Sequence, residues 1–137
     1  MRFKIYLSGP LFSQAEILWT RKLKVLLENK LGDRIDVLWP YEIASGSAKN
    51  IFDSNLLALS ECNLMVALLD GTQVDDGTAW EVGYFFARGG KILGLRTDFR
   101  KAGETEGSTV NLMIERSCLS ISKSPEMLLS NLKRLTA

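Results

Sequence analysis

Short apolar runs alternate with longer amphipathic segments along this 137-residue chain. The clearest run is Leu64–Leu69, whose sequence L-M-V-A-L-L is typical of a strand buried on both faces. Similar short runs predict further strands over residues 3–7, 35–38, 91–95 and 119–121. Helical spacing and cap signals predict helices over 13–29, from 50 or 53 to 62, 78–87, 110–115, and from 124 to the C-terminus.

This alternation predicts a small doubly wound α/β fold, with about five strands in a parallel sheet and helices on both faces. We expect residues 1–137 to form a single domain, because the chain has ordinary domain length and contains no long linker or repeat. Ligands of such sheets bind beyond the carboxyl ends of the strands, near a switch in strand order. The loops at 8–13, 70–77 and from 96 onward leave those ends, so their polar groups are the first candidates for a site.

Composition narrows the chemistry that this site can perform. The net charge of +1 gives no electrostatic case for binding a nucleic acid polymer or a membrane, and no apolar run approaches the roughly 20 residues of a membrane span. The absence of histidine removes Ser-His triads and the usual zinc sites, so we expect no metal. The two cysteines, Cys62 and Cys118, favour a reduced, cytoplasmic protein over a disulfide framework. Acid–base or nucleophilic work therefore falls on Asp, Glu, Tyr, Lys, Ser or Thr.

The segment 74–84, V-D-D-G-T-A-W-E-V-G-Y, contains the densest set of candidate groups. Thr78 and Glu81 have the spacing of a capping box, in which Thr78 is the N-cap and Glu81 occupies the third helical position. Glu81 also shares a helix side with Phe85 close to the expected crevice, where a poorly hydrated carboxylate is more basic and more nucleophilic. The segment alone is compatible with either role.

Asp75 and Asp76 are adjacent acids before a glycine, a pattern that usually forms turns or helix caps. Together with Glu81, they place two or three carboxylates on one short loop–helix unit. Glycosyl transfer needs such a set, because one group attacks or stabilises an oxocarbenium-like centre while another handles the proton of the leaving group.

The loop S-G-P-L-F-S at residues 8–13 lacks the glycine patterns of dinucleotide and P-loop sites, so it is a weak signal for phosphate. It forms either a tight turn with a proline-set backbone or one wall of a small-molecule pocket, where Phe12 could stack on a flat ring. Tyr6 lies at the end of the first strand, where its hydroxyl could reach a carboxylate, although such a tyrosine is also an ordinary core residue.

Taken together, these motifs resemble the nucleoside 2-deoxyribosyltransferase family. The matching segments lie between about residues 4 and 113 and read I-Y-L-S-G-P-L-F-S, A-L-L-D-G, D-D-G-T-A-W-E-V-G-Y, G-G-K-I-L and N-L-M. The Asp-x-Gly-Thr-Ala-aromatic-Glu-x-Gly-Tyr pattern is the most specific. The resemblance implies a Rossmann or flavodoxin-like fold and a double displacement at the anomeric carbon of a nucleoside. It also implies a place in nucleotide salvage and no need for a metal or organic cofactor.

The resemblance also assigns roles to individual positions. Glu81 matches the nucleophile that forms a covalent deoxyribosyl ester, Tyr6 the tyrosine that positions it, and Asp75 the aspartate that contacts the nucleobase and assists its protonation. Asn111 and Met113 match residues that reach into a neighbouring subunit, which implies a homo-oligomer with shared active sites. Further substrate-binding positions are Gly9, Pro10, Leu11, Phe12 and Gly77.

One position departs from the family pattern. The family carries an aspartate on the helix before the buried strand, and the matching residue is Asn55 in I-F-D-S-N-L-L. An amide hydrogen-bonds a sugar hydroxyl but cannot shuttle a proton. Asp53 does not replace it easily, because two residues turn a helix by about 200°.

Three functions follow as hypotheses. The first is a transferase that passes 2-deoxyribose from a nucleoside to a free nucleobase with net retention, with Glu81 as nucleophile. The second is a hydrolase of nucleosides or nucleoside monophosphates; monophosphates rank lower because the loop at 8–13 contains no Arg or Lys. The third is a non-catalytic nucleoside-binding module, which Asn55 motivates.

Overall fold

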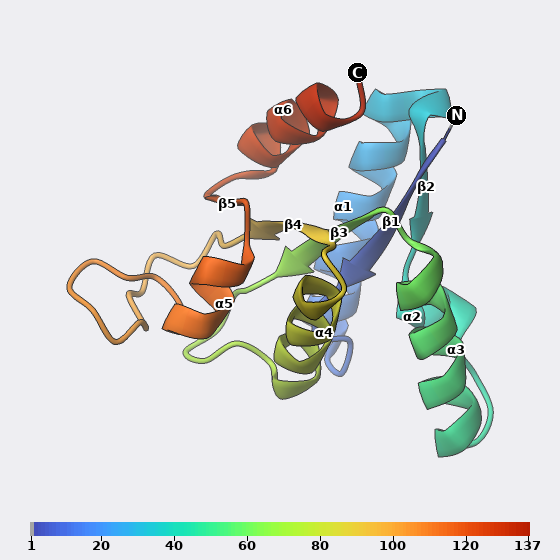
Figure 1. Cartoon of the computed structure of the whole chain (residues 1–137), viewed down its shortest axis with the longest axis horizontal. Coiled ribbons are helices and arrows are strands. Elements are labelled where there is room, and N and C mark those ends of the chain that lie inside the picture. Colours follow the sequence, from blue (N-terminus) through green and yellow to red (C-terminus); the bar gives the residue numbers. More distant parts are fainter. Residues whose placement is uncertain (1) are drawn as a thin grey trace.

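The computed structural model describes residues 2–137, and within them five strands form one all-parallel sheet in the order β2-β1-β3-β4-β5 (Figure 1). The strands alternate with helices, which confirms the predicted doubly wound α/β fold. In chain order, the elements are β1 (Phe3–Ser8), α1 (Gln14–Leu31), the 3-10 turn η1 (Gly32–Arg34), β2 (Ile35–Leu38), α2 (Pro40–Ile43), α3 (Ala48–Glu61), β3 (Leu64–Leu68), α4 (Asp76–Ala87), β4 (Lys91–Leu95), α5 (Leu112–Ser117), β5 (Ser120–Ser122) and α6 (Pro125–Leu135).

Two hydrophobic cores lie on opposite faces of the sheet, because alternate side chains of each strand point to opposite sides. Ile5 and Leu7 of β1 join the core beneath α1 and α6, whereas Tyr6 between them joins the core beneath α3, α4 and α5. β3 is buried at all five positions, as its continuous apolar sequence predicted. Tyr6 and α4 therefore lie on the same side of the sheet.

Local sequence explains where α1 begins and how it packs. Ser13 is its N-cap, and the capping box is complete because Ser13 accepts from the Glu16 amide while Glu16 accepts from the Ser13 amide. Leu23 and Leu27, one turn apart, are fully buried against the sheet. Each such leucine contributes about 1.5–3 kcal/mol to the stability of the fold.

Several boundaries differ from the predictions. α3 begins at Ala48 rather than at 50 or 53, because Ser47 caps it by accepting from the Asn50 amide. The short helix α2 was not predicted, since Trp39-Pro40 was interpreted only as the stop of β2; proline also suits the first turn of a helix, as it does here. α5 and β5 begin one or two residues later than expected.

The order of the strands creates a switch point between β1 and β3, since the chain moves from β1 outward to β2 and then returns to β3 on the other side. Ser8 ends β1 and pairs in register with Ala67 of β3, so the carboxyl ends of both strands meet at one edge. This is the edge at which doubly wound sheets bind ligands, and α4 contacts both strands.

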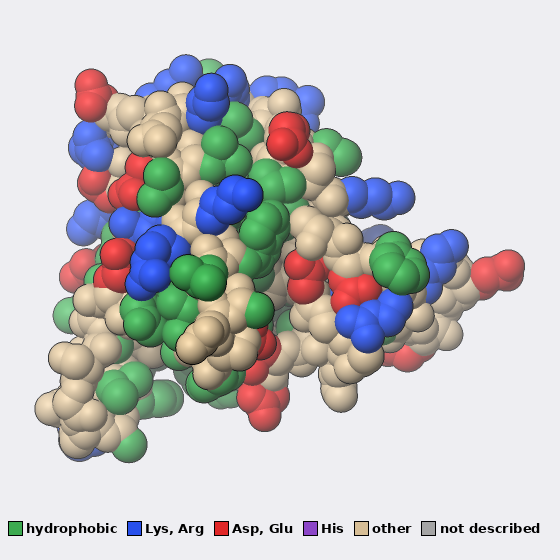
Figure 2. Space-filling model, turned by 180° about the vertical axis from the view of Figure 1, so that it is seen from behind, with side chains coloured by type: hydrophobic (Ala, Val, Ile, Leu, Met, Phe, Trp, Pro, Cys, Tyr) green, Lys and Arg blue, Asp and Glu red, His purple; other side chains and the backbone are tan. Residues whose placement is uncertain are grey.

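The surface carries charges of both signs. Figure 2 shows Lys and Arg side chains interspersed with Asp and Glu on one face, with hydrophobic side chains between them. On this face, the two signs of charge are mixed and do not gather in one patch. Among residues 2–137, no helix is both long and apolar enough to cross a membrane.

Candidate active site

Glu81 extends from α4 toward the carboxyl end of β1, where two hydroxyl groups hold its carboxylate. Tyr6 donates its phenolic proton to Oε2, and Ser8 donates from Oγ to Oε1 at 2.6 Å. Tyr6 and Ser8 are two residues apart on β1, so both point to the face that α4 covers. Both are fully buried. Each carboxylate oxygen therefore has its own donor, and the group is fixed in one orientation.

The surroundings make this carboxylate basic. Burial is the largest effect and raises the pKa of Glu81, and the negative charge of Asp75 raises it further, while the bonds from Ser8 and Tyr6 partly offset these effects. Burial and the charge of Glu81 also raise the pKa of Tyr6, so the phenol stays protonated and remains a donor. A fixed, poorly hydrated carboxylate of this kind is suited to nucleophilic attack.

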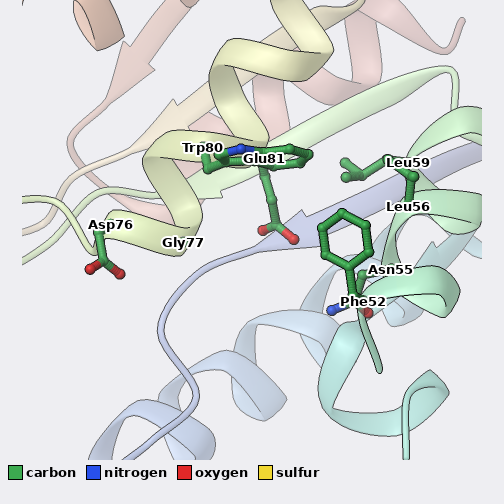
Figure 3. A pocket seen from close by; sticks show the side chains of 8 residues that line it. All are labelled: Phe52, Asn55, Leu56, Leu59, Asp76, Gly77, Trp80 and Glu81. Carbon is green, nitrogen blue, oxygen red and sulfur yellow. The ribbon is translucent and has the colours of Figure 1, made fainter. Parts of the chain in front are cut away.

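Two cavities open beside Glu81. The first, of about 400 Å³, is lined by Phe52, Asn55, Leu56, Leu59, Asp76, Gly77, Trp80 and Glu81 (Figure 3). The second, of about 410 Å³, is lined by Gly9, Leu11, Phe12, Pro40, Tyr41, Ala44, Ile51, Asn55, Asp75, Gly77, Thr78 and Glu81. Asn55, Gly77 and Glu81 line both, so the two cavities meet at the carboxylate. Each has the size of a small-ligand site.

Asp75, and not Thr78, is the N-cap of α4. Its Oδ2 accepts from the Thr78 amide at 2.9 Å and from Thr78 Oγ1 at 3.0 Å, and the helix begins at Asp76. The capping box predicted from Thr78 and Glu81 is therefore wrong, because Glu81 lies too deep in the helix and bonds β1 instead. Asp75 combines its structural role with a place in the wall of the second cavity.

Asn55 lies on α3 and faces both cavities. Among the described residues, its buried Oδ1 has no hydrogen-bond partner. Leaving a buried acceptor without a hydrogen bond costs about 1–3 kcal/mol of free energy. A ligand that donates a hydrogen bond to Asn55 Oδ1 would remove this cost. Asp53 pairs with Lys49 at 2.6 Å on the exposed side of the same helix and lines neither cavity.

The loop after β1 forms one wall of the second cavity. This is the second of the two interpretations that the sequence offered for residues 8–13. Gly9, Leu11 and Phe12 line that cavity, whereas Pro10 does not. Gly9 packs directly against β3, and a Cβ atom at this position would lie 2.9 Å from Cβ of Leu68. Phe12 is 78% exposed, so its ring is available to a ligand.

Asn111 and Met113 do not join Glu81 within the chain. They line another cavity of about 610 Å³, beside Arg96 and Val110, which shares Asp76 with the first cavity. Asn111 caps α5, since its Oδ1 accepts from the Met113 amide at 2.9 Å. The Met113 side chain is 73% exposed.

Sequence reasoning assigned no individual role to three residues at the site. Ser8 carries the second hydrogen bond to Glu81, and its position two residues after Tyr6 on a strand was the available signal. Phe52 and Trp80 come from different helices and both line the first cavity, where their rings meet edge to face with centroids 6.1 Å apart (Figure 3). Nothing in the local sequence brings these two rings together.

Metal-ligating and thiol side chains also occur among the described residues. Within residues 2–137, no group of three His, Cys, Asp or Glu side chains is placed to hold a metal ion. Cys62 and Cys118 are both free, and burial raises the pKa of the Cys62 thiol to about 12 and that of Cys118 to about 11. Both thiols are therefore protonated and unreactive at neutral pH.

Comparison with known proteins decides the family. The family model described as nucleoside 2-deoxyribosyltransferase matches residues 5–113, a span that includes Tyr6, Asn55, Asp75 and Glu81. The chain belongs to this family. The nucleoside 2-deoxyribosyltransferase family consists of enzymes that act on nucleosides. The Glu81 carboxylate and the two cavities beside it therefore belong to a member of such a family.

A relative and two solved structures are similar to the chain over most of its length. "Uncharacterized protein UU063" of Ureaplasma parvum is 32% identical over 117 residues, which cover 72% of this chain and 73% of that protein. A conserved protein from Enterococcus faecalis V583 is 28% identical, with a TM-score of 0.84 over 98% of this chain and 99% of the other. A 2-desoxiribosyltransferase from Leishmania mexicana shares the fold, with a TM-score of 0.80 over 96% and 97% of the two chains at 23% identity.

Proposed function

We propose that this member of the nucleoside 2-deoxyribosyltransferase family transfers 2-deoxyribose between nucleobases through a covalent ester on Glu81. The observation that carries the proposal is the Glu81 carboxylate, which Tyr6 and Ser8 hold at the junction of two small-ligand cavities. Histidine is absent from the chain, so a carboxylate is the natural nucleophile for such a site.

The proposed reaction has two displacements. In the first, one Glu81 oxygen attacks C1′ of a 2′-deoxynucleoside, the glycosidic C–N bond breaks, and the base leaves with the bonding electron pair. In the second, a nitrogen of an incoming base attacks C1′ on the opposite face and releases the carboxylate. Two inversions give net retention. Tyr6 and Ser8 keep the carboxylate aligned for attack, which is the positioning that makes an intramolecular step fast.

The remaining predicted positions take binding roles in this proposal. Asn55 Oδ1 accepts a hydrogen bond from a sugar hydroxyl, because it is a buried acceptor without a partner at the cavity junction. Asp75 contacts the nucleobase with its second oxygen and assists its protonation, and Phe12 stacks on the base. Gly9 and Leu11 form one wall and Gly77 of α4 contributes another, and Pro10 sets the backbone of the loop that carries Gly9 and Leu11.

We also propose that the protein is a homo-oligomer with shared active sites. Asn111 and Met113 lie away from Glu81 of their own chain, and the exposed Met113 is free to contact a neighbour. Exposed aromatic side chains near Glu81, namely Phe52 at 54% and Trp80 at 52%, are of the kind that a second subunit covers. Light scattering on the purified protein tests this proposal, and a monomer at the concentrations of the activity assay contradicts it.

A base-exchange assay tests the function. Purified protein is incubated with deoxyinosine or thymidine and with free adenine or cytosine, and the products are separated by chromatography. A new deoxynucleoside supports transfer. Free base and deoxyribose alone would instead indicate that water resolves the ester. Binding without any base release would indicate a nucleoside-binding module.

A further inference from the structure

Two hydroxyl groups reach the Glu81 carboxylate, one at each oxygen. The side chain extends from α4 toward the end of β1 (Figure 3), where Tyr6 donates to Oε2 and Ser8 donates to Oε1 at 2.6 Å. Within residues 2–137, these are the two hydrogen bonds that this carboxylate accepts. Since each carboxylate oxygen has two lone pairs, either oxygen can bond to carbon without losing its hydroxyl donor. Both donors therefore stay beside the oxygens when Glu81 forms an ester.

Burial gives this carboxylate two opposing properties. It raises the pKa of Glu81, which makes the charged group a stronger nucleophile and a poorer leaving group. The hydrogen bonds from Ser8 and Tyr6 act in the other direction and lower the pKa, and the bond from Ser8 has the larger effect of the two. A double displacement uses Glu81 first as nucleophile and then as leaving group. The second step therefore depends on the hydroxyl donors more than the first does.

The Ser8 hydroxyl is a fixed donor in a place without water. Ser8 is the last residue of β1, its backbone pairs in register with Ala67 of β3, and its side chain is fully buried. Within the described chain, the bond to Glu81 is the hydrogen bond that its hydroxyl makes. A donor that is already in place needs no rearrangement when negative charge appears beside it, and such donors stabilise developing charge strongly where water is excluded.

From these observations, and resting on the proposed deoxyribosyl transfer, we infer that the Ser8 hydroxyl is a catalytic group of the second displacement, where it stabilises the Glu81 carboxylate as that group leaves C1′. A ring nitrogen of the acceptor base attacks C1′, the ester C1′–O bond breaks, and its electron pair returns to the carboxylate beside the Ser8 donor. The N–H proton of the acceptor passes to Asp75, which handles the proton of the base in the proposed function. Ser8 thereby keeps the covalent intermediate short-lived.

One reaction measured in both directions tests the inference. Glu81 forms its ester from 2′-deoxyadenosine with release of adenine, and adenine breaks the same ester to restore the nucleoside. The two directions share one transition state, so a group that only positions the carboxylate changes both rate constants by the same factor. A group that stabilises the free carboxylate relative to the ester changes their ratio. Rapid quenching, with adenine followed by chromatography and the Glu81 adduct by mass spectrometry, gives both rate constants.

The variant Ser8→Ala is compared with the wild type at a pH where Glu81 is charged in both proteins. We expect ester breakdown to slow more than ester formation, so that the ratio of formation to breakdown rises about tenfold or more, as loss of a hydrogen bond to a charged group predicts. The Tyr6 donor stays in place, so the carboxylate keeps one anchor. Ser8→Cys places a weaker donor at the same position, and its ratio is expected to lie between the other two.

The outcomes separate the inference from the function on which it rests. An unchanged ratio in Ser8→Ala, including equal slowing in both directions, overturns the inference and leaves Ser8 as a positioning residue. A wild-type ratio in Ser8→Cys overturns it as well, and decides the question if Ser8→Ala does not fold. Ser122→Ala removes a buried hydroxyl that bonds Asn131 on the far side of the sheet order, at β5, and is expected to keep the wild-type ratio. A wild-type protein that releases no adenine and forms no adduct overturns the proposed function itself.

Discussion

Replacing Ser8 by alanine tests the claim that two hydroxyl groups set the charge and orientation of Glu81. The substitution removes the 2.6 Å bond to Oε1 and leaves Tyr6 as the remaining donor to the carboxylate. A hydrogen bond to a charged group contributes about 1.5–3 kcal/mol. At 1.36 kcal/mol for each factor of ten, the protonation equilibrium of Glu81 moves roughly 10- to 150-fold toward the uncharged form.

The sign of the resulting pH effect follows from the role of Glu81. Its carboxylate attacks only when charged, so activity falls as the pH drops through the pKa of Glu81, which burial already raises. Loss of the Ser8 donor raises that pKa further, because the bond from Ser8 opposes the effect of burial. We therefore expect the acidic limb of the kcat/KM profile to move to higher pH in Ser8→Ala.

The assay is base exchange over a series of pH values, with Ser122→Ala as the matched control. Ser122 is a buried serine on β5 whose Oγ accepts from Asn131 Nδ2 at 3.1 Å. The Ser122→Ala variant loses a comparable buried, hydrogen-bonded hydroxyl without touching Glu81, so it reports the general cost of such a loss. A Ser8→Ala profile that is lower at every pH but has its acidic limb unmoved refutes the reasoning.

Three further substitutions have definite expected outcomes. Tyr6→Phe removes the donor to Oε2, so kcat/KM measured in the exchange assay falls roughly 10- to 150-fold, and a wild-type rate contradicts this role. Asp75→Ala removes the cap of α4 and lowers the free energy of unfolding, measured in urea, by about 0.5–2 kcal/mol. Asp75→Asn retains most of this stabilisation, because asparagine also caps helices. Equal losses in the two variants exclude the cap as the cause. Asp53→Asn breaks only an exposed pair with Lys49, so activity stays unchanged and stability changes by about 0–1 kcal/mol; a large loss of turnover places Asp53 in the site after all.

The fold was largely predictable because its signals are local. The unbroken apolar sequence of 64–69 gives a strand buried on both faces, and the actual strand ends one residue earlier at Leu68. Ser13 and Glu16 show a complete capping box in sequence as in structure. The start of α3 was less predictable, because Ser47 caps it within a polar segment that offers several competing cap residues.

The site was predictable only in part, because it depends on how elements far apart in sequence pack together. The meeting of Tyr6 and Glu81 could be expected from the strand-end position of one and the family motif around the other. The role of Ser8 depends on the rotation of β1 beneath α4, and the Phe52–Trp80 contact depends on the packing of α3 against α4. The capping box at Thr78 failed because Asp75, three residues earlier, caps the helix, so Thr78 lies inside the first turn and its own amide is the one that is capped.

The central claim is that Glu81 becomes covalently attached to deoxyribose during turnover. Mass spectrometry of protein quenched during reaction with a 2′-deoxynucleoside, in the absence of an acceptor base, tests it most directly. We predict a mass increase of one deoxyribosyl group on the peptide that contains Glu81, and no increase in Glu81→Gln, which retains the fold but does not turn over. Base exchange by the Glu81→Gln variant at the wild-type rate, or rapid exchange by the wild type without any adduct on this peptide, would contradict the account.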